Sequence, residues 1–302
     1  MKETEQIQAI NDLIENQYAS KKYGELQALS KIFNKNFLDE LENILNSTSR
    51  NEPKYRDRFE VSCGWIDKIP LAQFINPVND INGNSIKGKM ELGDLLFIYS
   101  HNRINVISKG VENQSVENRA VIVQAKIANK ANPEVPIGRI SKGSVSSTSK
   151  ELALLSSWPE FDLYQTSRSK VPLLTNIQLD ATKSNAKFAG YFLKQWFVGE
   201  PTHKFVCNES LGSLIVNLKT GKEGQDFDTT KTFDWDKLIK TLIDTCGKYK
   251  LPNFIFKGSA WGRFFNIPRS PLIFYFYFGK NIFTRKRFPI IVINRIVQEG
   301  EL

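Results

Sequence analysis

Two short apolar segments that also carry polar side chains constrain this sequence more than any other feature. The first is Glu91–Tyr99 and the second is Ala120–Ile127, and a polar stretch separates them. Apolar runs of this length, bounded by polar and glycine-containing sequence, predict short buried strands. Because side chains alternate along a strand, Gln124 and Lys126 are expected on one face and Ala125 on the other. Buried strands rarely carry an amide and an amine, so these residues indicate a functional site.

The first segment supplies a carboxylate for the same face. If the two segments are neighbouring strands, Asp94 lies close to Gln124 and Lys126. A carboxylate, an amide oxygen and the Ala125 backbone carbonyl are oxygen ligands of the kind that bind Mg²⁺ or Mn²⁺. We therefore predict Asp94, Gln124 and Ala125 as metal ligands, and Lys126 as the residue that orients or deprotonates a water. Glu91 faces the other way on a regular strand, and its participation in catalysis stays open.

Asp94 followed by the tripeptide Gln124-Ala125-Lys126 resembles the pattern of the PD-(D/E)XK nuclease superfamily. In that superfamily an Asp opens one core strand, and Glu-x-Lys or Gln-x-Lys lies on the next. The resemblance implies an α/β fold with a restriction-endonuclease-like core, in which helices flank a mixed central sheet in the order helix, three strands, helix, strand. A helix followed by the corner Trp158-Pro159 and a strand is similar to a bacterial subfamily with Gln-x-Lys.

The resemblance also implies how the chain is divided. A helical lead occupies residues 1–24, the nuclease-like core residues 25–165, and an α+β extension packed on the core residues 166–302. The extension is expected to contain two helices and two strands, which are Glu209–Leu218, Trp235–Ile243, Leu272–Phe278 and Pro289–Val297.

The activity implied by the resemblance is that of a Mg-dependent endodeoxyribonuclease, with Mg²⁺ or Mn²⁺ as cofactor and double-stranded DNA as substrate. A role in restriction or phage defence is implied as well, either as a homodimer or with a partner protein of a defence system. Most of the family has an acid at the position of Gln124, and an amide adds no negative charge to the metal site. Three outcomes stay open: an active enzyme that relies on Glu91 or a helix acid, a slow enzyme, or an inactive subunit that binds nucleic acid or protein.

A helix before the first core strand often supplies a further acid in this family. Apolar residues at helical spacing predict helices over residues 3–19 and 24–46, and Phe59–Trp65 alternates as the first core strand should. The second helix contains four acidic candidates, which are Glu25, Asp39, Glu40 and Glu42. For each one taken singly, a solvated helix face is the simpler interpretation.

The formal charge of +9 favours a polyanionic partner. Basic residues in loops near the two strands and in the C-terminal hairpin turn are candidates for contacts with phosphates. They are Lys87, Lys89, Arg139, Lys142, Arg285, Lys286 and Arg287. The alternative interpretation is that the charge serves solubility, in which case the chain is a protein-interaction module.

Other classes of site and location are disfavoured. The three cysteines lack C-x-x-C spacing and the chain has two histidines, so a zinc site is not expected. Neither a G-x-S-x-G elbow nor a complete P-loop is present. The N-terminal residues do not form a signal peptide, and the longest apolar run, Leu272–Phe278, is too short to span a bilayer. We therefore expect a soluble cytoplasmic protein with no membrane partner.

Overall fold

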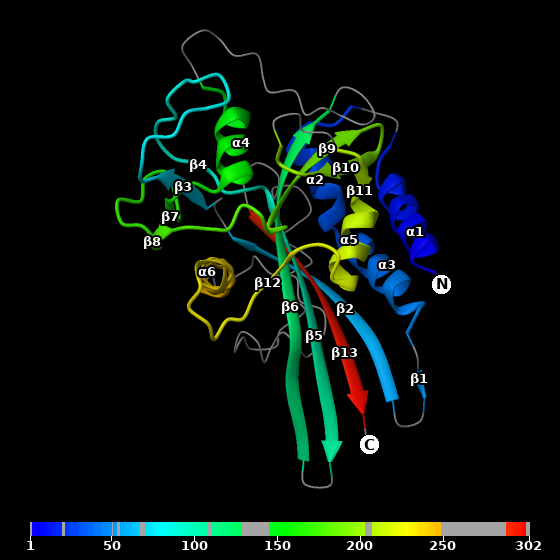
Figure 1. Cartoon of the computed structure of the whole chain (residues 1–302). Helices are drawn as coiled ribbons and strands as arrows, with labels where there is room; N and C mark the ends of the chain where they lie inside the picture. The colour runs from blue at the N-terminus through cyan, green and yellow to red at the C-terminus, as the bar shows by residue number, and fades with distance from the viewer. Residues whose placement is uncertain are drawn as a thin grey trace.

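The fold is α/β, with a mixed and curled central sheet (Figure 1). The computed structural model describes residues 2–19, 22–49, 51–52, 55–66, 70–107, 110–128, 145–202, 207–248 and 288–299. Within these residues the order of strands in the sheet is β1-β2-β13-β5-β6-β9-β10-β11, and β12 also pairs with β6. The strands are β1 (Asn51–Glu52), β2 (Tyr55–Ile66), β5 (Leu95–Ile107), β6 (Gly110–Ile127), β9 (Ala186–Phe192), β10 (Gln195–Gly199), β11 (Glu209–Ser210), β12 (Gln225–Asp226) and β13 (Phe288–Glu299).

A second, antiparallel sheet lies beside the central one. Its strand order is β4-β3-β7-β8. The strands are β3 (Leu71–Phe74), β4 (Met90–Glu91), β7 (Phe161–Tyr164) and β8 (Leu174–Ile177).

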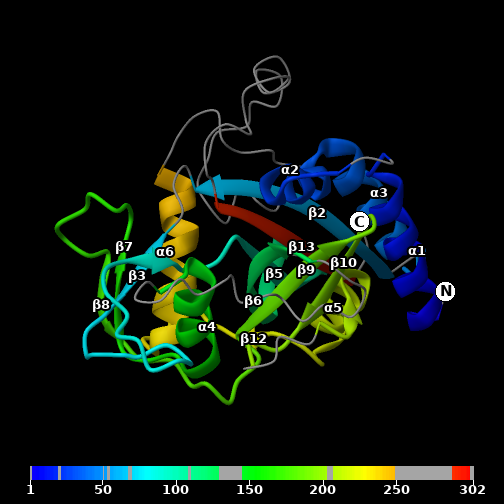
Figure 2. The ribbon, with the colours of Figure 1, turned by 90° about the horizontal axis from the view of Figure 1, so that it is seen from above.

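Helices cover both faces of the central sheet (Figure 2). On one face lie α4 (Ser147–Ser157), α6 (Asp234–Lys248) and the second sheet. The other face packs against α1 (Glu3–Asn16), α3 (Lys35–Asn46) and α5 (Leu211–Thr220), with α2 (Glu25–Ser30) nearby. Leu96 and Ile122 point to the first face, and Leu95 and Val123 point to the second. Burial on both faces explains why these strands are continuously apolar.

The two segments that dominate the sequence form one long antiparallel hairpin. Leu95 pairs with Val123, and the ladder continues to Ile107 and Gly110. The expected first segment is broken, however, because the backbone N–H of Leu92 bonds to the Pro70 carbonyl at 3.0 Å. Glu91 therefore belongs to the second sheet, whereas Asp94 directly precedes β5.

The helix expected over residues 24–46 is interrupted. It consists of α2, a 3-10 turn at Lys31–Phe33 and α3. Asn34 has extended backbone angles, and its side chain accepts the Phe37 N–H at 2.9 Å. An asparagine that caps a helix N-terminus in this way ends one helix and starts another. The helix expected over residues 3–19 is confirmed as α1.

Segments on both sides of the expected boundary at residue 165 contribute to the central sheet. β13 lies between β2 and β5, antiparallel to the first and parallel to the second. β9 extends the sheet next to β6 in parallel. The predicted helices of the C-terminal part are confirmed as α5 and α6, and the strand at 289–297 as β13. The strand expected at Leu272–Phe278 lies outside the described residues.

None of the helices in the described ranges is long and apolar enough to cross a membrane.

Candidate active site

The site begins where the ladder between β5 and β6 ends. The Asp94 backbone N–H donates to the Val123 carbonyl at 2.9 Å, which is the last backbone bond before β5 turns away. The next donor on that edge of β6 is the Ala125 N–H, and the Asp94 carboxylate accepts it at 2.8 Å. A carboxylate thus replaces the strand carbonyl that would otherwise continue the ladder. Because the N–H and C=O of one strand residue point to the same side, the Ala125 carbonyl also lies on this edge.

Gln124 shares the Asp94 oxygen. Its side-chain amide N–H donates to the carboxylate oxygen that also accepts the Ala125 N–H. Both side chains are buried, with 3% of Asp94 and none of Gln124 exposed. The amide oxygen of Gln124 has no hydrogen-bond partner within the described part of the chain. An unpaired buried oxygen beside a carboxylate is a position where a cation can bind.

Lys126 lies two residues further along the same face of β6. Its ammonium pairs with the Glu151 carboxylate of α4 at 2.9 Å, and 14% of its side chain is exposed. Glu151 is also buried, in a helix whose other inward residues include Leu152 and Leu155. Of Asp94, Gln124 and Lys126, only Lys126 retains appreciable exposure to solvent, so the site is most accessible beside this residue.

Burial and neighbouring charges shift the pKa values of both Asp94 and Lys126. Burial raises the pKa of Asp94 to about 8; the positive charge of Lys126 opposes this rise, and the charges of Glu25 and Glu151 add to it. Burial lowers the pKa of Lys126, but the charges of Glu151, Asp94 and Glu25 outweigh it and the net shift is upward. The lysine is therefore protonated at neutral pH, and the aspartate binds its proton tightly unless a cation displaces it.

Glu25 is the helix acid that acts on this site. It begins α2, and its charge affects both Asp94 and Lys126. The other three acids proposed from the sequence are on α3, where Asp39 pairs with Lys35 at 2.8 Å and Glu42 accepts the Val61 N–H at 2.9 Å. The break at Asn34 separates these acids from Glu25.

A glycine gives the chain room to enter β5 beside Asp94. A Cβ on Gly93 would lie 2.5 Å from the Ile122 Cγ2 and 3.3 Å from the Val123 carbonyl oxygen. Contacts this short occur essentially only with glycine, so this close approach depends on the missing side chain.

Glu91 and the predicted phosphate contacts lie elsewhere. Glu91 pairs with Leu71 of β3 in the second sheet, and the charges that act most on Asp94 come from other residues. The Lys89 ammonium donates to the Ser169 carbonyl at 2.5 Å and lies 3.6 Å from the centre of the Tyr164 ring. Lys87 is exposed. The remaining candidates, Arg139, Lys142, Arg285, Lys286 and Arg287, lie outside the described residues.

Glu151 was not predicted from the sequence. Its neighbour Lys150 does not take part in the site, because its ammonium donates to the Lys87 carbonyl at 3.1 Å. The available signal was a glutamate within the apolar run of α4, immediately before Leu152. The N-cap of that helix is Ser146, whose side chain accepts the Ser149 N–H.

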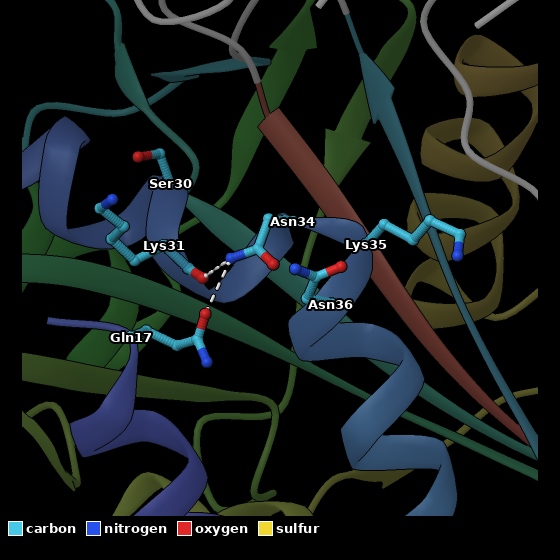
Figure 3. A pocket seen from close by; sticks show the side chains of 6 residues that line it. All are labelled: Gln17, Ser30, Lys31, Asn34, Lys35 and Asn36. Carbon is cyan, nitrogen blue, oxygen red and sulfur yellow. Dashed lines mark hydrogen bonds between the residues drawn. The ribbon is translucent and has the colours of Figure 1, made fainter. Parts of the chain in front are cut away.

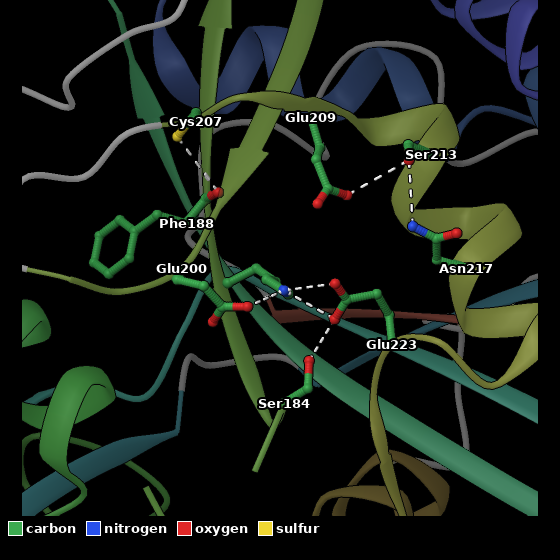
Figure 4. A network of polar contacts seen from close by, with 9 residues as sticks. Ser184, Phe188, Glu200, Cys207, Glu209, Ser213, Asn217 and Glu223 are labelled. Carbon is green, nitrogen blue, oxygen red and sulfur yellow. Dashed lines mark hydrogen bonds and ion pairs between the residues drawn. The ribbon is translucent and has the colours of Figure 1, made fainter. Parts of the chain in front are cut away.

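Two other polar features lie apart from this site. A surface cavity of about 400 Å³ lies between the end of α1 and the segment from α2 to α3 (Figure 3). It is lined by the polar residues Gln17, Ser30, Lys31, Asn34, Lys35 and Asn36. In the second, the buried Lys187 of β9 pairs with Glu223 at 2.8 Å and with Glu200, while Ser184 donates to Glu223 (Figure 4). In this second cluster one ammonium pairs with two carboxylates, and the Glu200 side chain is 56% exposed.

Within the described residues, no group of three or more His, Cys, Asp or Glu side chains is arranged to hold a metal. The set around Asp94 differs from such groups because an amide and a backbone carbonyl complete it. These oxygens suit a hard divalent cation, and the unpaired Gln124 oxygen is consistent with one. Comparisons of the chain with protein-family models, curated proteins and solved structures gave no match.

Proposed function

We propose that the protein is a divalent-metal-dependent nuclease that hydrolyses phosphodiester bonds, with double-stranded DNA as the expected substrate. The observation that carries the proposal is the meeting of Asp94, Gln124 and Lys126 on one face of two adjacent strands. The buried Asp94 carboxylate is bound to the Gln124 amide and the Ala125 N–H, and Lys126 is held beside it as a cation.

The order of elements supports a restriction-endonuclease-like core. A helix, three strands, a helix and a strand follow one another as α3, β2, β5, β6, α4 and β9, with the short strands of the second sheet between them. β5 and β6 are antiparallel, and β9 is parallel to β6. β13 is inserted between β2 and β5, as an addition to this order.

Asp94, Gln124 and the Ala125 carbonyl would hold Mg²⁺ or Mn²⁺. When bound, such a cation supplies a nucleophilic water and a counter-charge for the phosphate. Lys126 keeps its proton at neutral pH, so it acts by donating hydrogen bonds to a phosphate oxygen or to the attacking water. Because Lys126 is the most exposed of the three side chains, a phosphate would reach the site beside this residue. The net charge of +9 favours approach of a polyanion.

A nuclease assay tests the proposal. Purified protein is incubated with plasmid, linear duplex, single-stranded DNA and RNA, each with Mg²⁺, Mn²⁺ or chelator. We expect metal-dependent cleavage that is lost in Asp94→Ala and Lys126→Ala and retained in the control Asp12→Asn, whose carboxylate lies on the exposed face of α1. Cleavage that persists in both site variants would overturn the assignment. The role in restriction or phage defence, as a homodimer or with a partner protein, rests on the resemblance alone.

A second candidate is an inactive member of the fold that binds nucleic acid. It is favoured by the burial of Gln124 and by the hydrogen bond from its amide nitrogen to Asp94, which gives that carboxylate oxygen a partner without a cation. This candidate predicts salt-sensitive DNA binding without turnover. Cleavage that appears only in Gln124→Glu supports it, whereas metal-dependent cleavage by the natural sequence excludes it.

A further inference from the structure

We propose that Glu151 of α4 supplies the second negative charge of the cation site, in place of the acid that Gln124 lacks. This inference rests on the proposed function. The sequence pattern places this charge on β6, at position 124, whereas the inference places it on α4.

The position of Glu151 is the first argument. The residue is 2% exposed, and its carboxylate lies 2.9 Å from the Lys126 ammonium. Burial of a carboxylate is unfavourable unless opposite charge compensates it. Lys126 provides one positive charge, but it also faces Asp94 and Glu25, whose charges act on it together with that of Glu151.

The distribution of charges is the second argument. The charges of Glu25 and Glu151 act on Asp94, and all three carboxylates act on the Lys126 ammonium. Negative charge from two helices therefore reaches the end of the strand where the sequence pattern would place an acid at position 124. A divalent cation beside Asp94 would be stabilised by that charge, so an acid at position 124 is not required.

The third argument concerns the ligand itself. The Gln124 amide oxygen is fully buried and has no hydrogen-bond partner among the described residues, although the amide nitrogen of the same group is bonded to Asp94. A neutral oxygen left without a donor inside an acidic group points to a positively charged ligand. It also distinguishes this group from the Lys187 cluster, in which direct ion pairs and a serine hydroxyl bind the carboxylates.

The alternative is that Glu151 serves only to hold Lys126 in place. The two roles predict different results when the negative charge of Glu151 is removed and a new one is introduced at residue 124. If the cation needs the charge, a carboxylate at residue 124 can supply it, since that side chain borders Asp94. If the charge only positions Lys126, a carboxylate at residue 124 cannot replace that of Glu151.

Mn²⁺ binding to the full-length protein separates the two roles, measured by calorimetry and by the electron paramagnetic resonance of free Mn²⁺. The variants are Glu151→Gln, the double variant Glu151→Gln/Gln124→Glu, and the control Glu160→Gln. Glu160 hydrogen-bonds Asn76 at 3.3 Å, away from the site. We expect Glu151→Gln to weaken Mn²⁺ binding about 10- to 100-fold, the double variant to restore it to within about threefold, and the control to match the wild type.

Equal affinity in Glu151→Gln and wild type, or failure of the double variant to restore binding, overturns the inference. If circular dichroism shows that Glu151→Gln is unfolded, Glu151→Asp becomes the test variant and Glu160→Asp its control. Weaker Mn²⁺ binding is then expected in Glu151→Asp but not in Glu160→Asp. Wild-type protein that neither binds Mn²⁺ nor cleaves would remove the proposed function as well. Wild-type cleavage with unchanged Mn²⁺ affinity in Glu151→Gln removes only the role of Glu151.

Discussion

The carboxylate of Asp94 accepts the backbone N–H of Ala125 at 2.8 Å, at the point where β5 stops pairing with β6. This bond ties the position of an acidic side chain to the end of a β-ladder. The same backbone edge carries the Ala125 carbonyl. The placement of the acid relative to that carbonyl therefore depends on the main chain of β6.

Asp94→Asn tests the carboxylate without removing its hydrogen bonds. An asparagine oxygen can still accept from Ala125 and Gln124, so the variant is expected to fold. Loss of the negative charge is expected to reduce metal-dependent cleavage by at least about 10²-fold and to abolish saturable Mn²⁺ binding. Folding is checked by circular dichroism, with Asp12→Asn as the matched control. Full activity in a folded Asp94→Asn would show that this acid does not hold the metal.

The same substitution tests the electrostatics through pH. An aspartate side chain in water has an ordinary pKa of 3.8, and burial raises the pKa of Asp94 to about 8 in the folded protein. The folded state thus binds the proton more tightly, so this group stabilises the protein below pH 3.8 and that stability is lost as the pH rises towards 8.

Asp94→Asn removes this dependence. In the presence of chelator, we expect the free energy of unfolding of the variant, relative to wild type, to rise between pH 4 and pH 9 by on the order of a few kcal/mol. Urea unfolding of both proteins at several pH values measures the difference between their free energies of unfolding. The contributions of the other carboxyl groups cancel in this difference. Parallel curves for the two proteins would mean that Asp94 ionises normally.

Gly93→Ala tests the close approach at the start of β5. The added Cβ would meet the Ile122 Cγ2 at 2.5 Å, so strain of about 1–3 kcal/mol is expected. Ile122→Ala removes the methyl group that causes the clash. The double variant should therefore be more stable than the sum of the two single effects predicts, by at least about 0.5 kcal/mol in a double-mutant cycle. Additive effects would show that the strain arises from the backbone of Val123 instead.

Tyr18→Phe tests the support of α2, which carries Glu25. The Tyr18 hydroxyl donates to the Ala28 carbonyl at 2.8 Å and accepts the Trp196 indole N–H at 2.7 Å. Loss of the hydroxyl leaves the buried Ala28 carbonyl and Trp196 indole N–H without this partner. The free energy of unfolding is therefore expected to fall by about 1–3 kcal/mol. Hydrogen exchange should increase over Glu25–Ser30 more than over α5. An equal increase in both helices would argue against a local role.

Arg295→Lys tests whether β13 is an integral part of the sheet. The Arg295 guanidinium binds the Asp57 carboxylate of β2 through two hydrogen bonds, at 3.0 and 2.7 Å. A lysine cannot form both hydrogen bonds, so the free energy of unfolding is expected to fall by about 1 kcal/mol. Chemical unfolding of the variant is expected to remain a single cooperative transition. Two separate transitions would instead indicate that the C-terminal strand unfolds independently.

The sequence predicted the strands β2, β5, β6 and β13 and the helices α1, α5 and α6 because their signals are local. Alternation of side chains placed Gln124 and Lys126 on one face of β6. The break at Asn34 was missed because the apolar spacing continues across it, although asparagine is a favoured cap. The strand at Glu91–Tyr99 was predicted as one piece because its break depends on a bond to Pro70.

The sequence by itself determined the local pattern. It showed which segments form strands, which form helices, and which polar side chains share one face of a strand. Only the tertiary structure decided that Glu25 and Glu151 act on Asp94, and that β13 lies between β2 and β5. The physical reason is that periodicity is set by neighbours along the chain, whereas these groups are brought together by packing on two sides of a sheet. Charge at a site adds up through space, so residues distant in sequence act on Asp94 although no pattern along one strand reveals them.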